Sequence, residues 1–410
     1  MKKTIYSILA LALLAVVFSS CGKDGTPDIP GEGGDTGKHP ELWHYDCNIK
    51  GIEDIYPAID EQGNIYLAGA SEDIENGVVH FVSVDKDGNE RWDKTINATA
   101  TSYVIYGDGK VFVCTMNPVT IHAYNAGDGS ELWTKNYTND YGFEWLPVMS
   151  YANHKLYLGS GLFIHGVLMA LNPNNGDELW LRNLYDNFGI SLVVDGTKLF
   201  FGGLGNVTRY EDNGNGCDSI WHWEESEPSR GYIGFEITLA ENGNIYTRGD
   251  YGVNILSPET GEAIKVVSLG DSFDNSPSSI TIDGDGNFYI GNGDLHKYSS
   301  DGNLEWKTDI KVGLISPNYS SAPLIAENGN FYHGELFSLS CVKSNGSLDW
   351  VLGAEAGVGN LHPVVMDHDG NLISYSTERG VLFCYKGDGS KLATNGWPKR
   401  YGNMGNTCSR

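Results

Sequence analysis

Four short runs of alternating or aromatic-rich positions, separated by turn residues, make up residues 279–310. The runs are residues 279–282, 287–291, 295–298 and 304–308. The first and third alternate polar with apolar positions, the second is rich in aromatic residues, and the last carries a tryptophan, so each is typical of a β-strand. Asp285-Gly286 and Asp301-Gly302 accept the positive φ angles of tight turns. The pattern therefore predicts one four-stranded antiparallel sheet.

This unit recurs along the chain, as two independent markers show. The first marker is a turn residue followed by an apolar or aromatic run. Its copies begin at Gly63, Gly109, Asn153, Gly196, Gly243, Gly286, Gly329 and Gly370. The second marker is a glycine four residues before a tryptophan. Its copies are Gly88/Trp92, Gly129/Trp133, Gly176/Trp180, Gly302/Trp306 and Gly346/Trp350. A sheet of this kind cannot bury both of its faces alone, so its copies are expected to stack.

Less regular copies of the second marker account for the remaining units. Trp221 fits the second marker with an offset of one residue, whereas Lys265 and Ala393 are assigned the same place in degenerate copies. Trp43 is an extra copy of the last strand, ahead of the first full unit. A period of about 45 residues with four strands per unit is typical of β-propellers. We therefore predict an all-β, eight-bladed β-propeller of four-stranded antiparallel blades, in which the Trp43 strand joins the last blade.

Two of these copies carry a family resemblance. Residues 123–133 (AYNAGDGSELW) and 170–180 (ALNPNNGDELW) resemble the repeat of the PQQ-like, or quinoprotein-type, β-propellers. The resemblance extends from about Trp43 to the C-terminus and implies that the repeat tryptophan packs between neighbouring blades. The family includes pyrroloquinoline-quinone dehydrogenases, a lipoprotein of the outer-membrane barrel-assembly machinery and many binding propellers. Because one fold serves several functions, the resemblance predicts the fold and leaves the function open.

The N-terminus resembles a bacterial lipoprotein signal peptide. Lys2 and Lys3 precede an apolar run at residues 5–18, and small residues stand directly before Cys21. The run is short for a membrane-spanning helix, so we expect residues 1–20 to be cleaved and Cys21 to be lipidated, as in palmitate-bearing lipoproteins. An ordinary secretory signal with an incidental cysteine is the alternative. We predict a lipid anchor in the cell outer membrane, with the periplasmic face and the cell surface both open.

Two further segments follow the signal. Residues 21–40 are rich in glycine, proline and aspartate and lack an apolar run, so we expect a disordered tether. Residues 41–410 show no second break in composition and are predicted to be one propeller domain. The formal net charge of −26 disfavours nucleic acid and anionic lipid surfaces as partners. A solvated acidic surface explains this charge more simply than cation binding does.

The cysteines and the acidic turns do not predict a metal site. No CxxC spacing occurs among the seven cysteines, and Cys341 and Cys384 occupy matching strand positions that suit small buried residues. Cys47 and Cys408 lie near opposite ends of a chain that a closed propeller brings together, so a disulfide between them is possible. The acidic turn that begins at Asp283 lacks the glycine and glutamate of a calcium loop and is interpreted as a hairpin turn.

Long connections supply the candidate binding site. In a propeller, the link from an outermost strand to the next innermost strand emerges on the face that surrounds the central channel. These links and one inner loop contain aromatic and polar residues that suit a concave binding surface, although propellers also use aromatics in blade packing. The candidates for ligand or partner binding are Trp145, Phe163, His165, Tyr185, Trp223, Arg230, Tyr232, Phe273, Tyr319 and His362.

Catalysis has less support in the sequence. No GxSxG, HExxH or GxGxxG motif occurs, and no catalytic residue, metal ligand or cofactor is predicted. We predict a monomeric, non-catalytic binding or scaffolding propeller for a protein partner or a glycan. The alternative is an enzyme with its site at the propeller mouth, either a quinone-dependent dehydrogenase or a carbohydrate-active lyase or hydrolase. The sequence does not identify the ligand.

Overall fold

The structure, a computed structural model, describes most of the chain from residue 39 onwards. The described residues are 39–50, 55–71, 77–138, 146–162, 165–184, 189–203, 205–225, 236–249, 252–269, 279–291, 294–309, 322–335, 338–353, 361–376 and 379–410. The chain divides into two compact units, Met1–Glu32 and Gly33–Arg410, and the described residues belong to the second. In the described part of the chain, no helix has the length and apolar character needed to cross a membrane.

The described residues of the second unit form strands that assemble into eight sheets. The first sheet contains β2 (Ala58–Ile59), β3 (Ile65–Ala70), β4 (Val78–Val84) and β5 (Glu90–Asn97). The second contains β6 (Ala100–Thr101), β7 (Ile105–Gly107), β8 (Lys110–Met116), β9 (Thr120–Asn125) and β10 (Glu131–Asn136). The third contains β11 (Val148–Ala152), β12 (Lys155–Leu162), β13 (His165–Leu171) and β14 (Glu178–Leu184). The fourth contains β15 (Ser191–Asp195), β16 (Lys198–Gly203), β17 (Asn206–Asp212) and β18 (Cys217–Glu224).

The other four sheets follow in chain order. The fifth contains β19 (Ile237–Leu239), β20 (Ile245–Gly249), β21 (Gly252–Leu256) and β22 (Ala263–Ser268). The sixth contains β23 (Thr281–Ile282), β24 (Phe288–Gly291), β25 (Asp294–Tyr298) and β26 (Leu304–Asp309). The seventh contains β27 (Leu324–Ile325), β28 (Phe331–Glu335), β29 (Ser338–Val342) and β30 (Leu348–Gly353). The eighth contains β31 (Leu361–Met366), β32 (Leu372–Ser376), β33 (Val381–Tyr385) and β1 (Glu41–Asp46).

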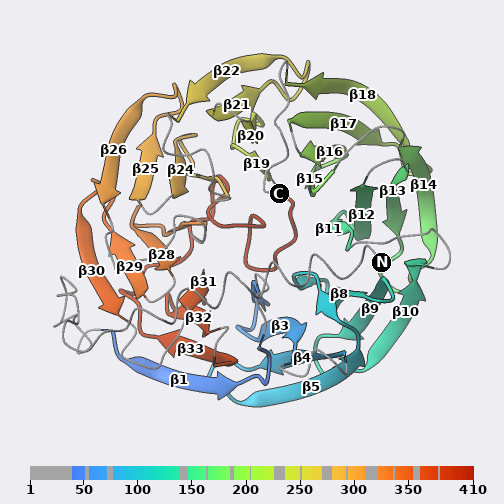
Figure 1. The fold of residues 1–410 in the computed structure, drawn as a ribbon, viewed down its shortest axis with the longest axis horizontal. Coiled ribbons are helices and arrows are strands. Elements are labelled where there is room, and N and C mark those ends of the chain that lie inside the picture. Colours follow the sequence, from blue (N-terminus) through green and yellow to red (C-terminus); the bar gives the residue numbers. More distant parts are fainter. Residues whose placement is uncertain are drawn as a thin grey trace, which may run out of the picture. The chain divides into compact units, whose positions relative to one another are not determined.

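The sheets form an eight-bladed β-propeller (Figure 1), which confirms the predicted fold class and blade number. In the first seven blades the strands pair antiparallel in chain order from the innermost strand outwards, and in the eighth β31, β32 and β33 are followed by β1. The second blade has five strands because its innermost strand is interrupted, and β6 and β7 both pair with β8.

The two ends of the propeller meet in the eighth blade. Strand β1 pairs with β33, and Trp43 stands opposite Cys384, so the expected joining of the Trp43 strand to the last blade is confirmed. The assignment of Ala393 to a degenerate outermost strand is wrong, because β1 already fills that place. Ala393 instead belongs to a C-terminal tail, where its backbone N–H donates to the carbonyl of Ile325 at 2.9 Å.

Burial decreases from the inside of each blade to the outside, as the hydrophobic pattern requires. Every residue of β3 is buried, because the strand lies between neighbouring blades as well as between its own neighbours. The outermost strand β1 alternates exposed and half-buried positions. Continuous apolar runs therefore become inner strands, and alternating runs become outer strands.

The acidic turns act as hydrogen-bond acceptors for their own backbone. Asp283 Oδ1 accepts from the backbone N–H groups of Asp285 at 3.0 Å and Asn287 at 2.9 Å. Its Oδ2 accepts from the hydroxyl of Tyr289 at 2.6 Å. The turn at Asp367 repeats the two backbone contacts. The carboxylates thus close hairpin turns, in agreement with the interpretation made from the sequence.

A tryptophan and a glycine from adjacent blades form the repeated contact between blades. Trp133 Nε1 donates to the carbonyl of Pro173 in the next blade at 2.9 Å. The indole face lies against Gly176, where an added Cβ would stand 2.7 Å from a ring atom. The same geometry joins Trp43 to Gly88, Trp92 to Gly129, Trp221 to Gly261 and Trp306 to Gly346. The glycine–tryptophan spacing in the sequence is therefore an interface motif: the glycine receives the tryptophan of the preceding blade.

Two interfaces between blades are also bridged by a side-chain hydrogen bond, but without the tryptophan–glycine contact. Lys265 replaces the tryptophan in the fifth blade, and its ammonium donates to the carbonyl of Asp301 in the sixth. Trp180 donates to Asp212 Oδ1 at 3.2 Å, and the other carboxylate oxygen accepts from Lys155 at 2.6 Å and Tyr157 at 2.7 Å. Burial alone would raise the pKa of Asp212, but these donors hold it below its usual range. The buried carboxylate is thus fully paired.

Replacing Gly176 by alanine tests the contact between blades. Gly176 and Gly109 share a φ of +71°, but an added Cβ at Gly109 has nothing within 4 Å. We expect Gly109→Ala to lower the free energy of unfolding by about 1 kcal/mol through backbone strain alone. Gly176→Ala should cost about 2 kcal/mol more, because the Trp133 indole must shift. Urea unfolding measures the free energy of unfolding of both variants. Equal losses of stability would show that the contact with the Trp133 indole does not restrict residue 176.

Candidate functional site

Most of the predicted site residues lie outside the described residues. These are Trp145, Phe163, Tyr185, Arg230, Tyr232, Phe273 and Tyr319. His165 is the first residue of β13 and His362 the second of β31, and their backbones alone are described. Trp223 lies in β18 opposite Val207 and packs, half-buried, against a core cluster that includes Val207. Trp223 therefore contributes to blade packing, and the predicted group as a whole stays a prediction.

The C-terminal tail, residues 386–410, crosses the centre of the ring (Figure 1) and was not anticipated from the sequence. It hydrogen-bonds through its backbone to the innermost strands of several blades. The donor and acceptor pairs are Ile59 N to Met404 O, Tyr106 N to Gly405 O, Tyr151 N to Thr407 O, Val194 N to Cys408 O, Ile282 N to Trp397 O and Ile325 N to Pro398 O. The tail thus ties together blades that are far apart in the sequence.

These contacts lie toward one end of the channel. Ile59 and Ile282 are the last residues of β2 and β23, and Val194 is the last but one of β15. Because all innermost strands of a propeller run in the same sense, the tail occupies the end at which these strands finish. It therefore crosses the channel at the end opposite the one at which the innermost strands begin.

A buried lysine and a buried asparagine hold the tail in shape. Lys399 is 2% exposed and Asn406 is 0% exposed. The Lys399 ammonium donates to the carbonyls of Arg400 at 2.8 Å and Asn403 at 3.0 Å, and to the side-chain oxygen of Asn406. Asn406 Nδ2 in turn donates to the carbonyls of Tyr56 at 2.9 Å and Val104 at 3.1 Å. Burial lowers the pKa of Lys399 to about 7.

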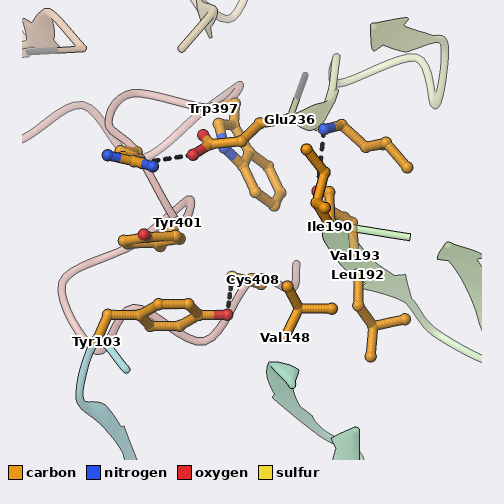
Figure 2. A pocket seen from close by; sticks show the side chains of 12 residues that line it. Tyr103, Val148, Ile190, Leu192, Val193, Glu236, Trp397, Tyr401 and Cys408 are labelled. Atoms are coloured by element: carbon orange, nitrogen blue, oxygen red, sulfur yellow. Dashed lines mark hydrogen bonds and ion pairs between the residues drawn. The ribbon is translucent and has the colours of Figure 1, made fainter. Parts of the chain in front are cut away.

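A cavity of about 130 Å³ lies above the tail, at the end where the innermost strands begin. Figure 2 shows its walls, to which Ile190, Leu192 and Val193 contribute from one side and Tyr103 and Tyr401 from the other. The full lining is Tyr103, Val148, Ile190, Ser191, Leu192, Val193, Glu236, Ile237, Trp397, Arg400, Tyr401 and Cys408. Segments 139–145, 185–188 and 226–235 lead directly into the strands that carry this lining, so the cavity belongs to the predicted loop face.

Aromatic rings and one ion pair form the polar side of the cavity. The ring of Tyr401 stacks on that of Tyr103, with 3.9 Å between centroids and 18° between planes. Arg400 Nε donates to Glu236 Oε1 at 2.5 Å, and its guanidinium lies 5.0 Å from the centroid of the Tyr401 ring. The tail therefore supplies both the floor and part of the wall.

The possible disulfide between Cys47 and Cys408 is not formed in the structure, where both are free thiols. Cys408 Sγ lies 3.5 Å from Tyr103 Oη in the cavity wall, whereas Cys47 Sγ contacts the carbonyl of Tyr45 at 3.6 Å. Burial raises the pKa of the Cys408 thiol to about 12, so the thiol is protonated and unreactive at neutral pH. Cys341 and Cys384 are fully buried packing residues, as expected.

Comparison with known proteins supports the fold. A family model described as "Outer membrane protein assembly factor BamB" matches residues 36–229. No curated protein matches the chain significantly. Taken with the blade repeat, the family match supports a PQQ-like β-propeller fold.

Solved structures that resemble the chain include several propellers. BamB from Moraxella catarrhalis is 14% identical, with 85% of this chain and 99% of that chain covered and a TM-score of 0.63. The quinohemoprotein alcohol dehydrogenase ADHIIG from Pseudomonas putida HK5 is 12% identical, with 89% and 79% covered and a TM-score of 0.60. Sqt1 from Saccharomyces cerevisiae is 11% identical, with 85% and 99% covered and a TM-score of 0.63. At these identities the likeness shows the fold alone.

Substitution of Lys399 tests how the tail is held. Between a folded pKa of about 7 and an unfolded pKa of about 10.4, the unfolded chain binds a proton that the folded chain lacks. This group therefore makes the free energy of unfolding rise with pH, by about 1 kcal/mol per unit near pH 8. In Lys399→Met that contribution should vanish, whereas Lys391→Met, at an exposed tail position, should retain it. Urea unfolding from pH 6.5 to 8.5 measures the slopes, and parallel slopes for all three proteins would show that Lys399 stays charged in the fold.

Proposed function

We propose that this chain is an outer-membrane lipoprotein whose propeller is a non-catalytic binding or scaffolding module for a protein partner. The observation that carries the proposal is the tail across the channel together with the cavity beside it. The tail crosses one end of the channel, and a cavity lies between it and the beginnings of the innermost strands of neighbouring blades. A rigid disc with one concave face needs only surface complementarity to hold a partner.

The family match supports the choice of a protein partner and of the outer membrane. The matching model describes an assembly factor for outer membrane proteins, and its match begins at residue 36, just before β1. Cys21 and the preceding apolar run supply the proposed lipid anchor, with residues 21–40 as the tether. Both the periplasmic face and the cell surface fit such an anchor.

An enzyme is the competing function, and the likeness to a quinohemoprotein alcohol dehydrogenase is the observation in its favour. A pyrroloquinoline-quinone site would need a metal and several ligands, but no group of three or more His, Cys, Asp or Glu in the described ranges is arranged to hold one. A glycosidase would need paired carboxylates, and Glu236 is the single carboxylate in the cavity lining, where it is paired with Arg400. The described residues therefore fit neither chemistry.

Lipid anchoring is tested by Cys21→Ala in the full chain. Without the thiol that receives the lipid, the protein should move from the membrane fraction to the soluble fraction or keep an uncleaved signal. Fractionation of cells with detection of the protein measures this, and Cys47→Ala serves as a control at a cysteine outside the signal. A Cys21→Ala protein that is processed and still sediments with the membrane would contradict the anchor.

Partner binding is tested by cross-linking the full-length protein in intact envelopes. Wild type should enrich one or more outer-membrane proteins, and Trp145→Ala or Tyr232→Ala on the proposed loop face should reduce the enrichment at least tenfold. Leu132→Ala is the matched control, because Leu132 is 39% exposed on the outer rim of the second blade. Oxidation of an alcohol by the purified protein with added quinone and calcium would overturn the non-catalytic function.

A further inference from the structure

The size of the central cavity selects a small ring. Its volume is about 130 Å³. An engineered apolar cavity of about 150 Å³ in another protein binds benzene, so a volume of this order accommodates one six-membered ring and excludes an oligosaccharide or a fused polycyclic group. The ligand that fits is one ring, or one ring-bearing side chain of a larger molecule.

The walls of the cavity are apolar over most of their extent. Aliphatic side chains face Tyr103 and Tyr401 across the space, and Trp397 lies at one end of it (Figure 2). The aliphatic lining consists of Val148, Ile190, Leu192, Val193 and Ile237. Burial of an aromatic ring among such groups is favourable through its apolar area, and neighbouring rings add offset or edge contacts.

Tyr103, Ser191, Glu236 and Arg400 of the lining already have hydrogen-bond partners within the protein. Tyr103 Oη donates to the carbonyl of Met149 at 2.6 Å and accepts from its N–H at 3.2 Å. Ser191 Oγ accepts from the N–H of Ile237 at 3.0 Å. Arg400 and Glu236 pair with each other. A sugar ring enclosed here would leave hydroxyl groups without hydrogen bonds, at a cost of about 1–3 kcal/mol for each one.

We propose that the cavity receives the aromatic side chain of a phenylalanine from the protein partner, inserted from the loop face. This inference rests on the proposed function and favours the protein partner over the glycan that the sequence left open. The tail closes the opposite end, so the ring enters where the innermost strands begin and the rest of the partner lies across the loop face. Protein interfaces commonly concentrate their affinity in such a central, desolvated aromatic anchor.

The first experiment measures ring selectivity with small probes. The full-length protein in lipid nanodiscs is mixed with N-acetyl-phenylalanine amide, N-acetyl-alanine amide or methyl β-glucoside, and saturation-transfer NMR detects binding, with empty nanodiscs as the blank. We expect a signal above the blank from the phenylalanine amide alone. Absence of that signal, or an equal signal from the glucoside, would overturn the proposal.

Variants that fill the cavity test whether the phenylalanine ring binds there. Val148, the first residue of β11, and Ile190, which directly precedes β15, are half-buried lining residues. Val148→Trp and Ile190→Trp therefore fill the cavity from two neighbouring blades. Each should weaken binding of the phenylalanine amide at least tenfold. Leu348→Trp adds the same ring at a rim position that is 43% exposed and should leave binding unchanged. Unchanged binding in both filled variants would refute the assignment to this cavity.

A variant with an enlarged cavity should bind a larger ring, and a variant that had merely unfolded would not gain this binding. Ile190→Ala should admit N-acetyl-tryptophan amide, which wild type excludes, and so shift the preference from phenyl to indole. Wild-type selectivity in this variant would count against the cavity as the binding site.

The filled variants also separate this inference from the proposed function. If cross-linking captures the partner equally well with Val148→Trp, Ile190→Trp and wild type, the aromatic anchor is refuted while partner binding stands. If no partner is captured although the phenylalanine amide binds wild type and not the filled variants, the cavity specificity stands and the proposed function falls.

Discussion

The packing of one tryptophan against one glycine of the next blade sets the architecture of this protein. In most interfaces the indole fits against the turn of the next blade because the facing residue lacks a side chain, and its N–H finds an acceptor there. The turn that carries the glycine provides both, as Gly176 and Pro173 do for Trp133. The same contact repeated around the ring fixes the spacing of the blades and explains why the turn residues are as regular as the hydrophobic ones.

The exceptions show which part of this contact is indispensable. Lys265 keeps a donor to the next turn without an aromatic ring, and Trp180 keeps its ring but donates to the carboxylate of Asp212. In both cases the outermost strand still donates a hydrogen bond to the following blade. The shared feature is thus a side-chain donor on the outermost strand that crosses the interface and finds an acceptor in the next blade, whereas the ring–glycine contact varies.

Sequence patterns predicted the blades but not the tail, and the reason is physical. Alternation, turn glycines and repeated tryptophans report side-chain burial within a sheet, so they located Trp43 in the last blade and Lys265 in a degenerate strand. The tail is held by backbone hydrogen bonds and by the buried polar pair Lys399 and Asn406, which leave no periodic pattern. Ala393 was misplaced because a strand was expected where the chain had already turned inward. Trp397, a tryptophan outside the repeat, was the available signal.

The tail couples the stability of the ring to the chemistry of its centre. Tyr401, Asn406 and Cys408 have φ angles of +64°, +55° and +51°, conformations that cost non-glycine residues about 1–3 kcal/mol each. The backbone bonds to the innermost strands hold the tail in this shape, and the strained turns aim the Tyr401 ring at Tyr103 and the Cys408 thiol into the cavity wall. If the tail detached, the channel would open and the cavity would lose its floor together with Trp397, Arg400 and Tyr401. The shape of the binding cavity therefore depends on ring closure, and a partner that binds only the intact cavity stabilises the closed ring by mass action.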